Sequence, residues 1–247
     1  MMSPKGDSPK PHRRRRPQKK VGRASHVEVS QERPLAEMRP KDEAVMGPVS
    51  LRLSRALEKR IGRGVEWIAS PHFGERSGII DTVVLHYTAT GSLEETIRIF
   101  RKEAIGPSSH YVVGKDGLII QMVDIEKKAW HAGESEFQGR GDVNDFSIGI
   151  ELVNWGLLKE RDGLFFAWPG EYGTAYQGKL PVFADGQWWD PFTETQYDVL
   201  TELIRQIRVC YPSITPERIV GHEGIARPKG RKMDPGLAFD WNRVWKA

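Results

Sequence analysis

Cysteine is nearly absent from this sequence. The single cysteine, Cys210, has no partner for an internal disulfide and excludes a cysteine-rich zinc site. Any bound metal must therefore be held by histidine and carboxylate side chains. Long apolar runs are also missing, because no stretch approaches the roughly 18 consecutive apolar residues of a membrane span. No apolar run follows the basic N-terminus, so we predict neither a transmembrane segment nor a Sec-type signal peptide.

Excess positive charge is confined to the N-terminus. Residues 1–23 carry nine Lys or Arg against one acid, whereas the remaining residues carry 28 basic and 32 acidic side chains. Residues 1–50 are rich in Pro, Lys, Arg, Ser and Glu without an apolar period, which predicts a disordered basic tail. Its run Arg13–Lys20 has two interpretations. It is either a surface for an anionic partner such as nucleic acid, lipid headgroups or cell-wall polymer, or a solvated segment without a specific role.

Strand and helix patterns alternate over residues 51–247. Strands are expected at Ile79–Tyr87, Tyr111–Val113, Leu118–Val123, Ser147–Val153 and Arg218–Gly221. Helices are expected at Leu51–Ile61, after a capping box at Ser92 and Glu95 with apolar residues as far as Ala104, and after a second box at Thr193 and Gln196 with apolar residues as far as Tyr211. This alternation predicts a single α/β domain with a central mixed sheet flanked by helices.

Residues 155–192 interrupt that alternation with a segment rich in glycine and aromatic residues. The aromatic residues are Trp155, Phe165, Phe166, Trp168, Tyr172, Tyr176, Trp188 and Trp189. Insertions of this length are usually functional or disordered, and the aromatic content argues against disorder. Two interpretations stay open: a wall of a groove that holds sugar or peptide on flat aromatic surfaces, or a subsidiary core.

Four polar residues lie within or next to apolar segments. Burying a polar side chain there costs free energy unless the side chain is paired or faces a cleft. His86 closes an apolar run, Glu151 lies within another, His222 follows a third, and Asp234 precedes a Pro-Gly turn. Two histidines and one carboxylate from separate elements can hold a catalytic zinc ion, with the fourth position left for water.

Other interpretations of these residues remain open from the residue types alone. His110 and His131 are rival ligands for a metal. Glu151 can equally be a buried structural carboxylate paired with Arg140 or Lys232. In the same way, a histidine at the end of a strand can be a core residue, and the aspartate can cap the turn that follows it.

Seven short segments add a more specific signal. They are Ser70–Phe73, Val84–Ala89, Ser109–Tyr111, Ala129–Gly133, Asn144–Glu151, Gly221–His222 and Lys232–Gly236. In these segments and in their order the chain resembles the zinc amidase family that includes phage T7 lysozyme, bacterial muropeptide-recycling amidases and animal peptidoglycan-recognition proteins. The resemblance spans residues 70–240 and leaves the tail uncovered. It is closest to the bacterial broad-specificity and recycling branch.

The resemblance implies an activity and a role for five residues. It makes the chain an N-acetylmuramoyl-L-alanine amidase, which hydrolyses the amide bond between N-acetylmuramic acid and L-alanine in peptidoglycan or muropeptides. It implies that His86, His222 and Asp234 bind one Zn²⁺ per chain. It also implies that Glu151 is the general base and acid, and that Lys232 stabilises the oxyanion.

The same motifs imply contacts with the substrate. His131, Trp130, Tyr87 and Asn144 are predicted to bind it, whereas His110 is predicted to pack or to orient a ligand. The alternative function is a peptidoglycan-binding module that does not cut, and the tail leaves nucleic-acid binding as a third idea.

The sequence departs from relatives at two motifs. Ser109 stands where T7 lysozyme has a catalytic tyrosine, which leaves the role to Glu151. Gly114–Gly117 replaces the Arg-Arg-Asp-Gly hairpin of the recycling enzymes, which weakens an expectation of strict selectivity for 1,6-anhydro sugars. The chain is expected to be a monomer that is cytoplasmic in the producing cell, with phage-style release onto the cell wall as the other possibility.

Overall fold

The computed structural model describes residues 46–102, 104–167 and 173–245. The predicted tail lies almost entirely outside these residues, as do the basic run Arg13–Lys20 and two aromatic residues of the insertion, Trp168 and Tyr172. In the described part of the chain, no helix combines the length and the apolar character needed to cross a membrane.

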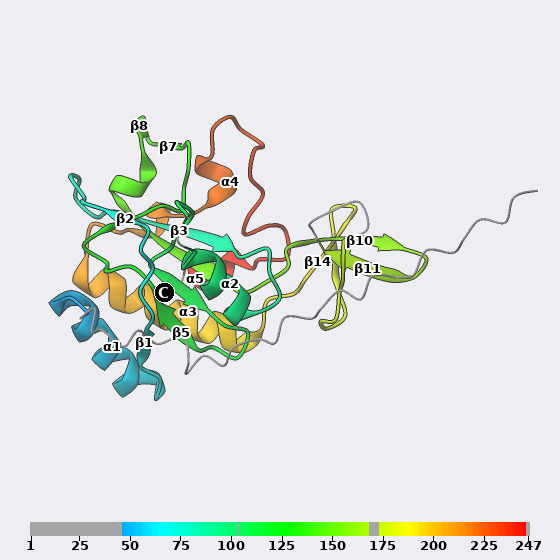
Figure 1. Ribbon diagram of the computed structural model, residues 1–247, viewed down its shortest axis with the longest axis horizontal. Coiled ribbons are helices and arrows are strands. Elements are labelled where there is room, and N and C mark those ends of the chain that lie inside the picture. Colours follow the sequence, from blue (N-terminus) through cyan, green and yellow to red (C-terminus); the bar gives the residue numbers. More distant parts are fainter. Residues whose placement is uncertain (1–45, 103, 168–172, 246–247) are drawn as a thin grey trace, which may run out of the picture. The chain divides into compact units, whose positions relative to one another are not determined.

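A six-stranded mixed sheet forms the centre of the fold (Figure 1). Its strands, in spatial order, are β1 (Val65–Trp67), β5 (Ile119–Gln121), β4 (Tyr111–Val113), β9 (Ser147–Leu152), β3 (Thr82–Tyr87) and β15 (Ile219–Gly221). The neighbours β4, β9, β3 and β15 run parallel, β1 and β5 run parallel, and β4 pairs with β5 antiparallel. The predicted α/β class with a central mixed sheet is confirmed.

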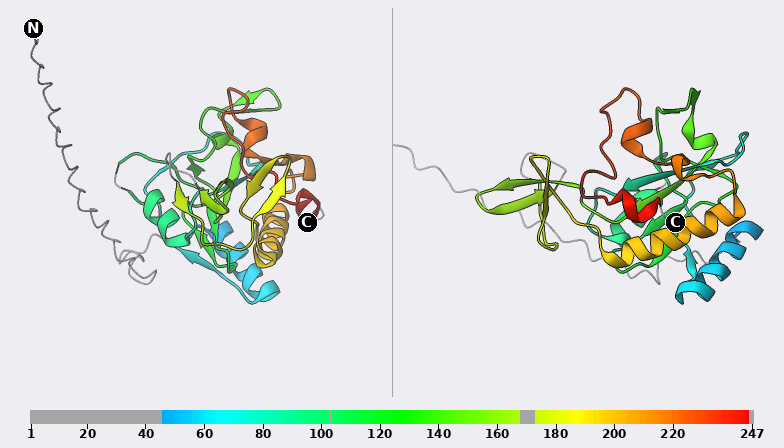
Figure 2. Two further views of the ribbon diagram at one scale, coloured as in Figure 1. Left: turned by 90° about the vertical axis from the view of Figure 1, so that its right-hand side faces the viewer. Right: turned by 180° about the vertical axis from the view of Figure 1, so that it is seen from behind.

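Helices cover both faces of this sheet (Figure 2). They are α1 (Pro48–Ile61), α2 (Leu93–Phe100), α3 (Glu194–Cys210), α4 (His222–Ile225) and α5 (Trp241–Val244). Apolar residues of α1 and α3 pack with β3 and β9 in the largest buried cluster, whereas α2 packs with β4 and β5 in a second cluster. Because strand residues alternate between faces, the same sheet contributes apolar residues to both buried clusters.

Short elements complete the main domain. Two antiparallel pairs join β2 (Phe73–Gly74) to β6 (Lys128–Ala129), and β7 (Glu136–Phe137) to β8 (Arg140–Gly141). Single 3-10 turns lie at Val143–Asp145 and Pro216–Arg218. The loop from β6 to β9 carries several of the motif residues and packs against β9.

The expected elements are present with shifted ends. The helix α1 begins at Pro48 rather than Leu51, because proline is well suited to the first turn of a helix. The reciprocal capping box at Thr193 and Gln196 forms, but Tyr211 lies just beyond the end of α3. At α2 only half of the predicted box forms: Ser92 accepts from the backbone of Glu95, whose side chain pairs with Arg98 instead. This helix also ends at Phe100, before Ala104.

The described residues between 155 and 192 form a second sheet. Its five antiparallel strands are, in spatial order, β12 (Thr174–Ala175), β11 (Leu164–Ala167), β10 (Leu157–Arg161), β14 (Gln187–Trp189) and β13 (Val182–Ala184). Figure 1 shows β10, β11 and β14 together in this second sheet. We refer to it below as the insertion sheet.

One buried aspartate fastens the insertion sheet to the main domain. Asp190, which is 1% exposed, accepts hydrogen bonds from Lys115 Nζ at 2.9 Å, from Tyr176 Oη at 2.7 Å and from the backbone N–H of Trp155 at 2.9 Å. Asn154 Nδ2 donates to its carbonyl at 3.0 Å. The lysine belongs to the turn between β4 and β5, so the contact joins the two sheets.

Candidate active site

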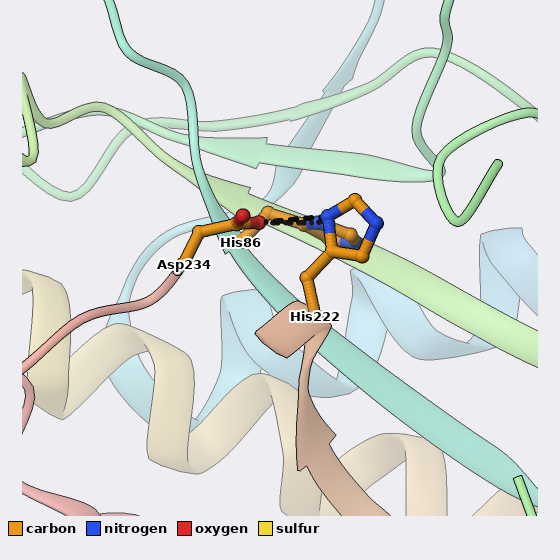
Figure 3. A group of neighbouring side chains, drawn as sticks. All are labelled: His86, His222 and Asp234. Atoms are coloured by element: carbon orange, nitrogen blue, oxygen red, sulfur yellow. Dashed lines mark hydrogen bonds and ion pairs between the residues drawn. The ribbon is translucent and has the colours of Figure 1, made fainter. Parts of the chain in front are cut away.

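Three predicted ligands meet at the carboxyl edge of the central sheet. His86 lies near the end of β3, and His222 begins α4 directly after the parallel neighbour β15. Asp234 reaches them from the loop between α4 and α5 (Figure 3). All three side chains are buried, at 2%, 3% and 7% exposure. Carboxyl ends of neighbouring parallel strands are the usual place for a ligand site in α/β sheets, and this topology gathers residues that are 148 positions apart.

The three side chains present a compact triangle of atoms. His86 Nδ1 lies 2.9 Å from Asp234 Oδ2, His222 Nδ1 lies 3.0 Å from the same oxygen, and the two nitrogens are 3.0 Å apart. Three atoms at roughly 2.0–2.2 Å from one metal ion are separated by about this spacing. Among the described residues this is the one group of histidine, cysteine and carboxylate side chains that converges in this way.

The donor chemistry of the triangle fits a bound cation. His222 Nε2 lies 3.0 Å from the carbonyl oxygen of Ala132 and donates to it, so a neutral ring directs its Nδ1 lone pair toward Asp234. A carboxylate oxygen and an imidazole lone pair only 3.0 Å apart repel each other unless a positive charge lies between them. This arrangement favours a metal ion, or a proton in its absence.

Burial and the carboxylate set the charges of these groups. Burial lowers the pKa of His86 to about 4, although the bond to Asp234 acts in the opposite direction. Burial acts to raise the pKa of Asp234, but hydrogen bonds with His222 and His86 outweigh it and hold that pKa below its usual range. Near neutral pH His86 is therefore a neutral imidazole and Asp234 an ionised carboxylate, the forms that bind metal.

Glu151 lies beside the triangle. It pairs with His86 in the register of β9 against β3, is 8% exposed, and its Oε2 has no hydrogen-bond partner among the described residues. Burial raises its pKa to about 8; the charge of Asp234 adds to the rise and that of Lys232 opposes it. The alternative pairing with Arg140 is wrong, because that arginine bonds Asp81 at 2.9 Å. A buried carboxyl with a raised pKa beside a candidate metal site is typical of a proton-transfer group.

A cavity of about 810 Å³ opens over these residues. One side is formed by the triangle with Glu151, and the exposed Lys232 stands at its edge. The insertion sheet forms another part of the lining, through residues that include Lys159 and Phe166. This size lies within the range of small-ligand sites.

Aromatic residues of the insertion divide between two surroundings, and whether any of them holds substrate stays a prediction. Trp155 and Phe166 line the cavity, as a groove wall requires. Phe165, Trp188 and Phe183 instead pack on one another, with ring centroids 5.1 and 4.8 Å apart, as a small subsidiary cluster does.

The four predicted substrate residues separate into two pairs. Tyr87 and His131 line the cavity. Trp130 is not part of its lining and stacks on His72 at 5.9 Å. Asn144 is also outside the lining, and its Oδ1 accepts from the backbone N–H groups of His131 and the next residue at 3.0 and 2.8 Å. Their contact with substrate stays a prediction, and the geometry of Asn144 assigns it the task of holding the loop.

The rival histidine His110 has other partners. Its Nδ1 accepts from Gly149 N at 3.0 Å, and its Nε2 lies 3.0 Å from the carbonyl oxygen of Lys127. Burial, together with the charge of Arg76, lowers its pKa to about 3. Burial and the neighbouring histidines likewise lower the pKa of His131 well below the ordinary value. Both rings are therefore neutral near pH 7.

Arg76 is a half-buried cation to which the sequence alone assigns no role. Its guanidinium donates to the carbonyl oxygens of Lys127, Ser147 and Asn144 at 2.6, 3.0 and 3.1 Å, and burial lowers its pKa to about 10. It ties the loop before β9 to the strand that carries Glu151. An arginine in a polar stretch gives no local sign of such a role.

Comparisons with known proteins agree with this geometry. The family model described as N-acetylmuramoyl-L-alanine amidase matches residues 76–237. The 1,6-anhydro-N-acetylmuramyl-L-alanine amidase AmpD of Haemophilus influenzae is 34% identical over 212 residues, which cover 78% of this chain and 97% of that protein. The N-acetylmuramoyl-L-alanine amidase AmiD of Escherichia coli is 34% identical over 173 residues, which cover 67% of this chain and 52% of that protein.

Solved structures show the same fold. A selenomethionine derivative of AmpD superposes with a TM-score of 0.54 at 27% identity, covering 73% of this chain and 92% of that one. Escherichia coli AmiD in complex with anhydro-N-acetylmuramic acid-L-Ala-D-γ-Glu-L-Lys gives a TM-score of 0.51 at 31% identity, covering 68% of this chain and 56% of that one. With the matched family model spanning most of the described chain, the protein belongs to the N-acetylmuramoyl-L-alanine amidase family.

Proposed function

We propose that this protein is a zinc-dependent amidase that cuts the bond between N-acetylmuramic acid and L-alanine in muropeptides. The observation that carries the proposal is the buried triangle of His86, His222 and Asp234 beside Glu151, open to a cavity of about 810 Å³. Two nitrogens and one carboxylate oxygen are a typical catalytic zinc set, which leaves one position open. We propose one zinc ion per chain.

The chemistry divides among the bound metal and two side chains. Zinc, when bound, supplies Lewis-acid polarisation of the scissile carbonyl and acidifies the attacking water. In its ionised form Glu151 would take a proton from the attacking water and pass it to the leaving amine, because it lines the cavity and its Oε2 has no hydrogen-bond partner among the described residues. Lys232, exposed at the edge of the same cavity, places a positive charge near the developing oxyanion.

A muropeptide is the proposed substrate class. Two related structures hold such ligands: the AmiD complex described above and an AmpDh3 complex from Pseudomonas aeruginosa with an anhydromuramic pentapeptide. Both relatives exceed 25% identity with this chain and have TM-scores of 0.51. These names favour recycling chemistry over phage-style release. A cytoplasmic location and a monomeric state stay predictions from the sequence.

We further propose that residues 51–247 act as one amidase domain, with residues 155–192 as part of its cavity wall. The contacts of Asp190 with Lys115 and Tyr176 support this unit, because they join the insertion sheet to the central sheet. Residues 1–45 are proposed to be dispensable for hydrolysis, whereas residues 48–50 belong to α1; an anionic partner for the basic run stays a prediction.

The test is cleavage of a purified anhydromuropeptide, followed by mass spectrometry of the products. The proposal expects release of an intact stem peptide that begins at L-alanine, lost after chelation and restored by one equivalent of zinc. A protein that binds zinc and muropeptide but releases no peptide would support the alternative, a binding module. A protein that cuts equally well after chelation would contradict the metal-dependent mechanism.

A further inference from the structure

His131 lies over one face of β9, and the residues of that face are fitted to it. Ser147, Gly149 and Glu151 alternate along the strand and therefore point to the same side. A Cβ atom on Gly149 would lie 2.5 Å from Cγ of the His131 ring, a distance that packed atoms do not adopt. Because glycine has no side chain, this position leaves free the space that the imidazole ring occupies.

The donor and the acceptor of each hydrogen bond around Ser147 follow from the distances. Its Oγ lies 2.6 Å from the carbonyl oxygen of Val143, and two oxygens at that distance need a proton between them. The hydroxyl has one proton, which is donated to the carbonyl. The contact of 3.2 Å between Ser147 Oγ and His131 Nε2 therefore has the imidazole as donor, and the ring carries its proton on Nε2.

The proton position on His131 also determines the proton position on His86. A neutral imidazole with its proton on Nε2 has an acceptor at Nδ1. His131 Nδ1 lies 3.0 Å from His86 Nε2, so His86 donates this bond and keeps its proton on Nε2. Its other nitrogen, Nδ1, then directs a lone pair toward Asp234 Oδ2 at 2.9 Å.

We propose that Ser147 and His131 form a relay that sets the tautomer of His86 and so prepares its Nδ1 to bind the metal. His131 is then a positioning residue that acts through His86 rather than a substrate contact. The proposal rests on the metal site proposed above. His222 needs no such relay, because its Nε2 bonds directly to the Ala132 carbonyl. Ligand histidines are commonly oriented by the partner of their second nitrogen, and here that partner is another histidine.

Three variants and one control test the relay by zinc affinity, measured in competition with a chromophoric chelator. His131→Leu removes the acceptor, and Ser147→Ala frees His131 to move its proton to Nδ1. His131→Asn places an amide oxygen where Nδ1 stands and keeps the acceptor. The control is Ser109→Ala, since Ser109 is also fully buried but its Oγ has no hydrogen-bond partner among the described residues.

We expect His131→Leu and Ser147→Ala to weaken zinc binding roughly 10–100-fold, the usual effect of losing the partner of a ligand histidine. His131→Asn is expected to retain most of the affinity, and Ser109→Ala all of it. Wild-type affinity in both His131→Leu and Ser147→Ala would overturn the relay while leaving the metal site intact. Absence of zinc binding by the wild-type protein would instead overturn the proposed function.

Nitrogen-15 NMR of the zinc-loaded wild-type protein gives a second readout that needs no variant to fold. The relay requires both His86 and His131 to carry their protons on Nε2. A spectrum with His131 protonated on Nδ1 would contradict it, whatever the stability of the variants.

Discussion

The two sheets of this protein bring different kinds of side chain to one cavity. The central sheet contributes His86 and Glu151, which lie on neighbouring strands, and His222 begins α4 directly after β15; these three side chains are between 2% and 8% exposed. The insertion sheet contributes Lys159, which is exposed, and Phe166, which is half-buried. Buried groups fixed by parallel strands can hold the geometry that catalysis requires. The exposed groups on the other sheet are suited to contacts that tolerate variation in the substrate.

Loss of a ligand should have the largest effect. Asp234→Ala removes the shared oxygen of the triangle, so we expect loss of tight zinc binding and a decrease in kcat/KM of roughly 10³-fold or more, because several kcal/mol of Lewis-acid stabilisation disappear. Zinc titration and muropeptide cleavage measure this. Asp198→Ala, whose side chain is 74% exposed, is the matched control and should leave both quantities unchanged.

Removal of the proposed proton carrier should come next. Glu151→Gln keeps the shape of the side chain but cannot transfer a proton, so we expect kcat to fall about 10²–10⁴-fold with zinc still bound. Glu160→Gln changes a carboxylate on the other wall of the cavity and should have little effect. Equal losses from the two variants would contradict the division of labour between the sheets.

Acid should destabilise the metal-free central sheet more than the insertion sheet. His110 has a pKa of about 3 in the folded protein and about 6.5 when unfolded. The contribution of neutral His110 to the free energy of unfolding is therefore complete above pH 6.5. It is lost as the pH falls toward 3, at up to about 1.4 kcal/mol per pH unit. The insertion sheet segment 157–189 contains no histidine. Denaturant unfolding of the metal-free protein from pH 7 to 4, with hydrogen exchange to locate the opening, measures this. Greater acid sensitivity in the insertion sheet than in the central sheet would contradict this prediction.

Truncating an apolar side chain should lower the free energy of unfolding more in the central sheet than in the insertion sheet. Ile148→Ala removes a fully buried side chain of β9 and should lower the free energy of unfolding by about 2–5 kcal/mol. Phe183→Ala removes a side chain that is 59% exposed, and we expect a change of about 1 kcal/mol or less. Urea unfolding measures both, and similar losses would show that the insertion sheet carries more of the stability than its burial indicates.

The smallest effect is expected on the exposed wall. Lys159→Glu reverses a charge that lines the cavity, so KM for a muropeptide with free carboxylates should rise about two- to fivefold at low salt, with kcat unchanged, as for other exposed ion pairs. Lys179→Glu, which is exposed outside this cavity, is the control. A large decrease in kcat for Lys159→Glu would give the insertion sheet a role in the chemistry itself.

The sequence patterns predict the central sheet and mark two of the candidate site residues. Apolar runs with branched residues predict β3 and β9, and polar residues at the ends of such runs mark His86 and Glu151. Both signals are local, so they can be detected before the fold is known. Because strand topology brings distant ends together, the family resemblance was needed to select His222 and Asp234 over the rival histidines.

The sequence was not sufficient where a role depends on long-range packing. The motifs predict that Asn144 and His131 bind substrate, which stays a prediction, but they give no sign that Asn144 holds the loop backbone or that His131 bonds His86. Arg76 bonds carbonyl groups that are 51 to 71 residues away. The insertion sheet was also missed as a sheet, since its strands span two to five residues and show little periodicity.

The most direct test of the account is hydrolysis in water enriched in oxygen-18. Attack of water on the lactyl carbonyl predicts that the label enters the carboxylate of the sugar fragment, and that the released peptide, beginning at L-alanine, stays unlabelled. This result should require zinc, and Glu151→Gln should slow it about 10²–10⁴-fold. Label in the carboxylate of a peptide fragment, or cleavage that persists without metal, would contradict the account.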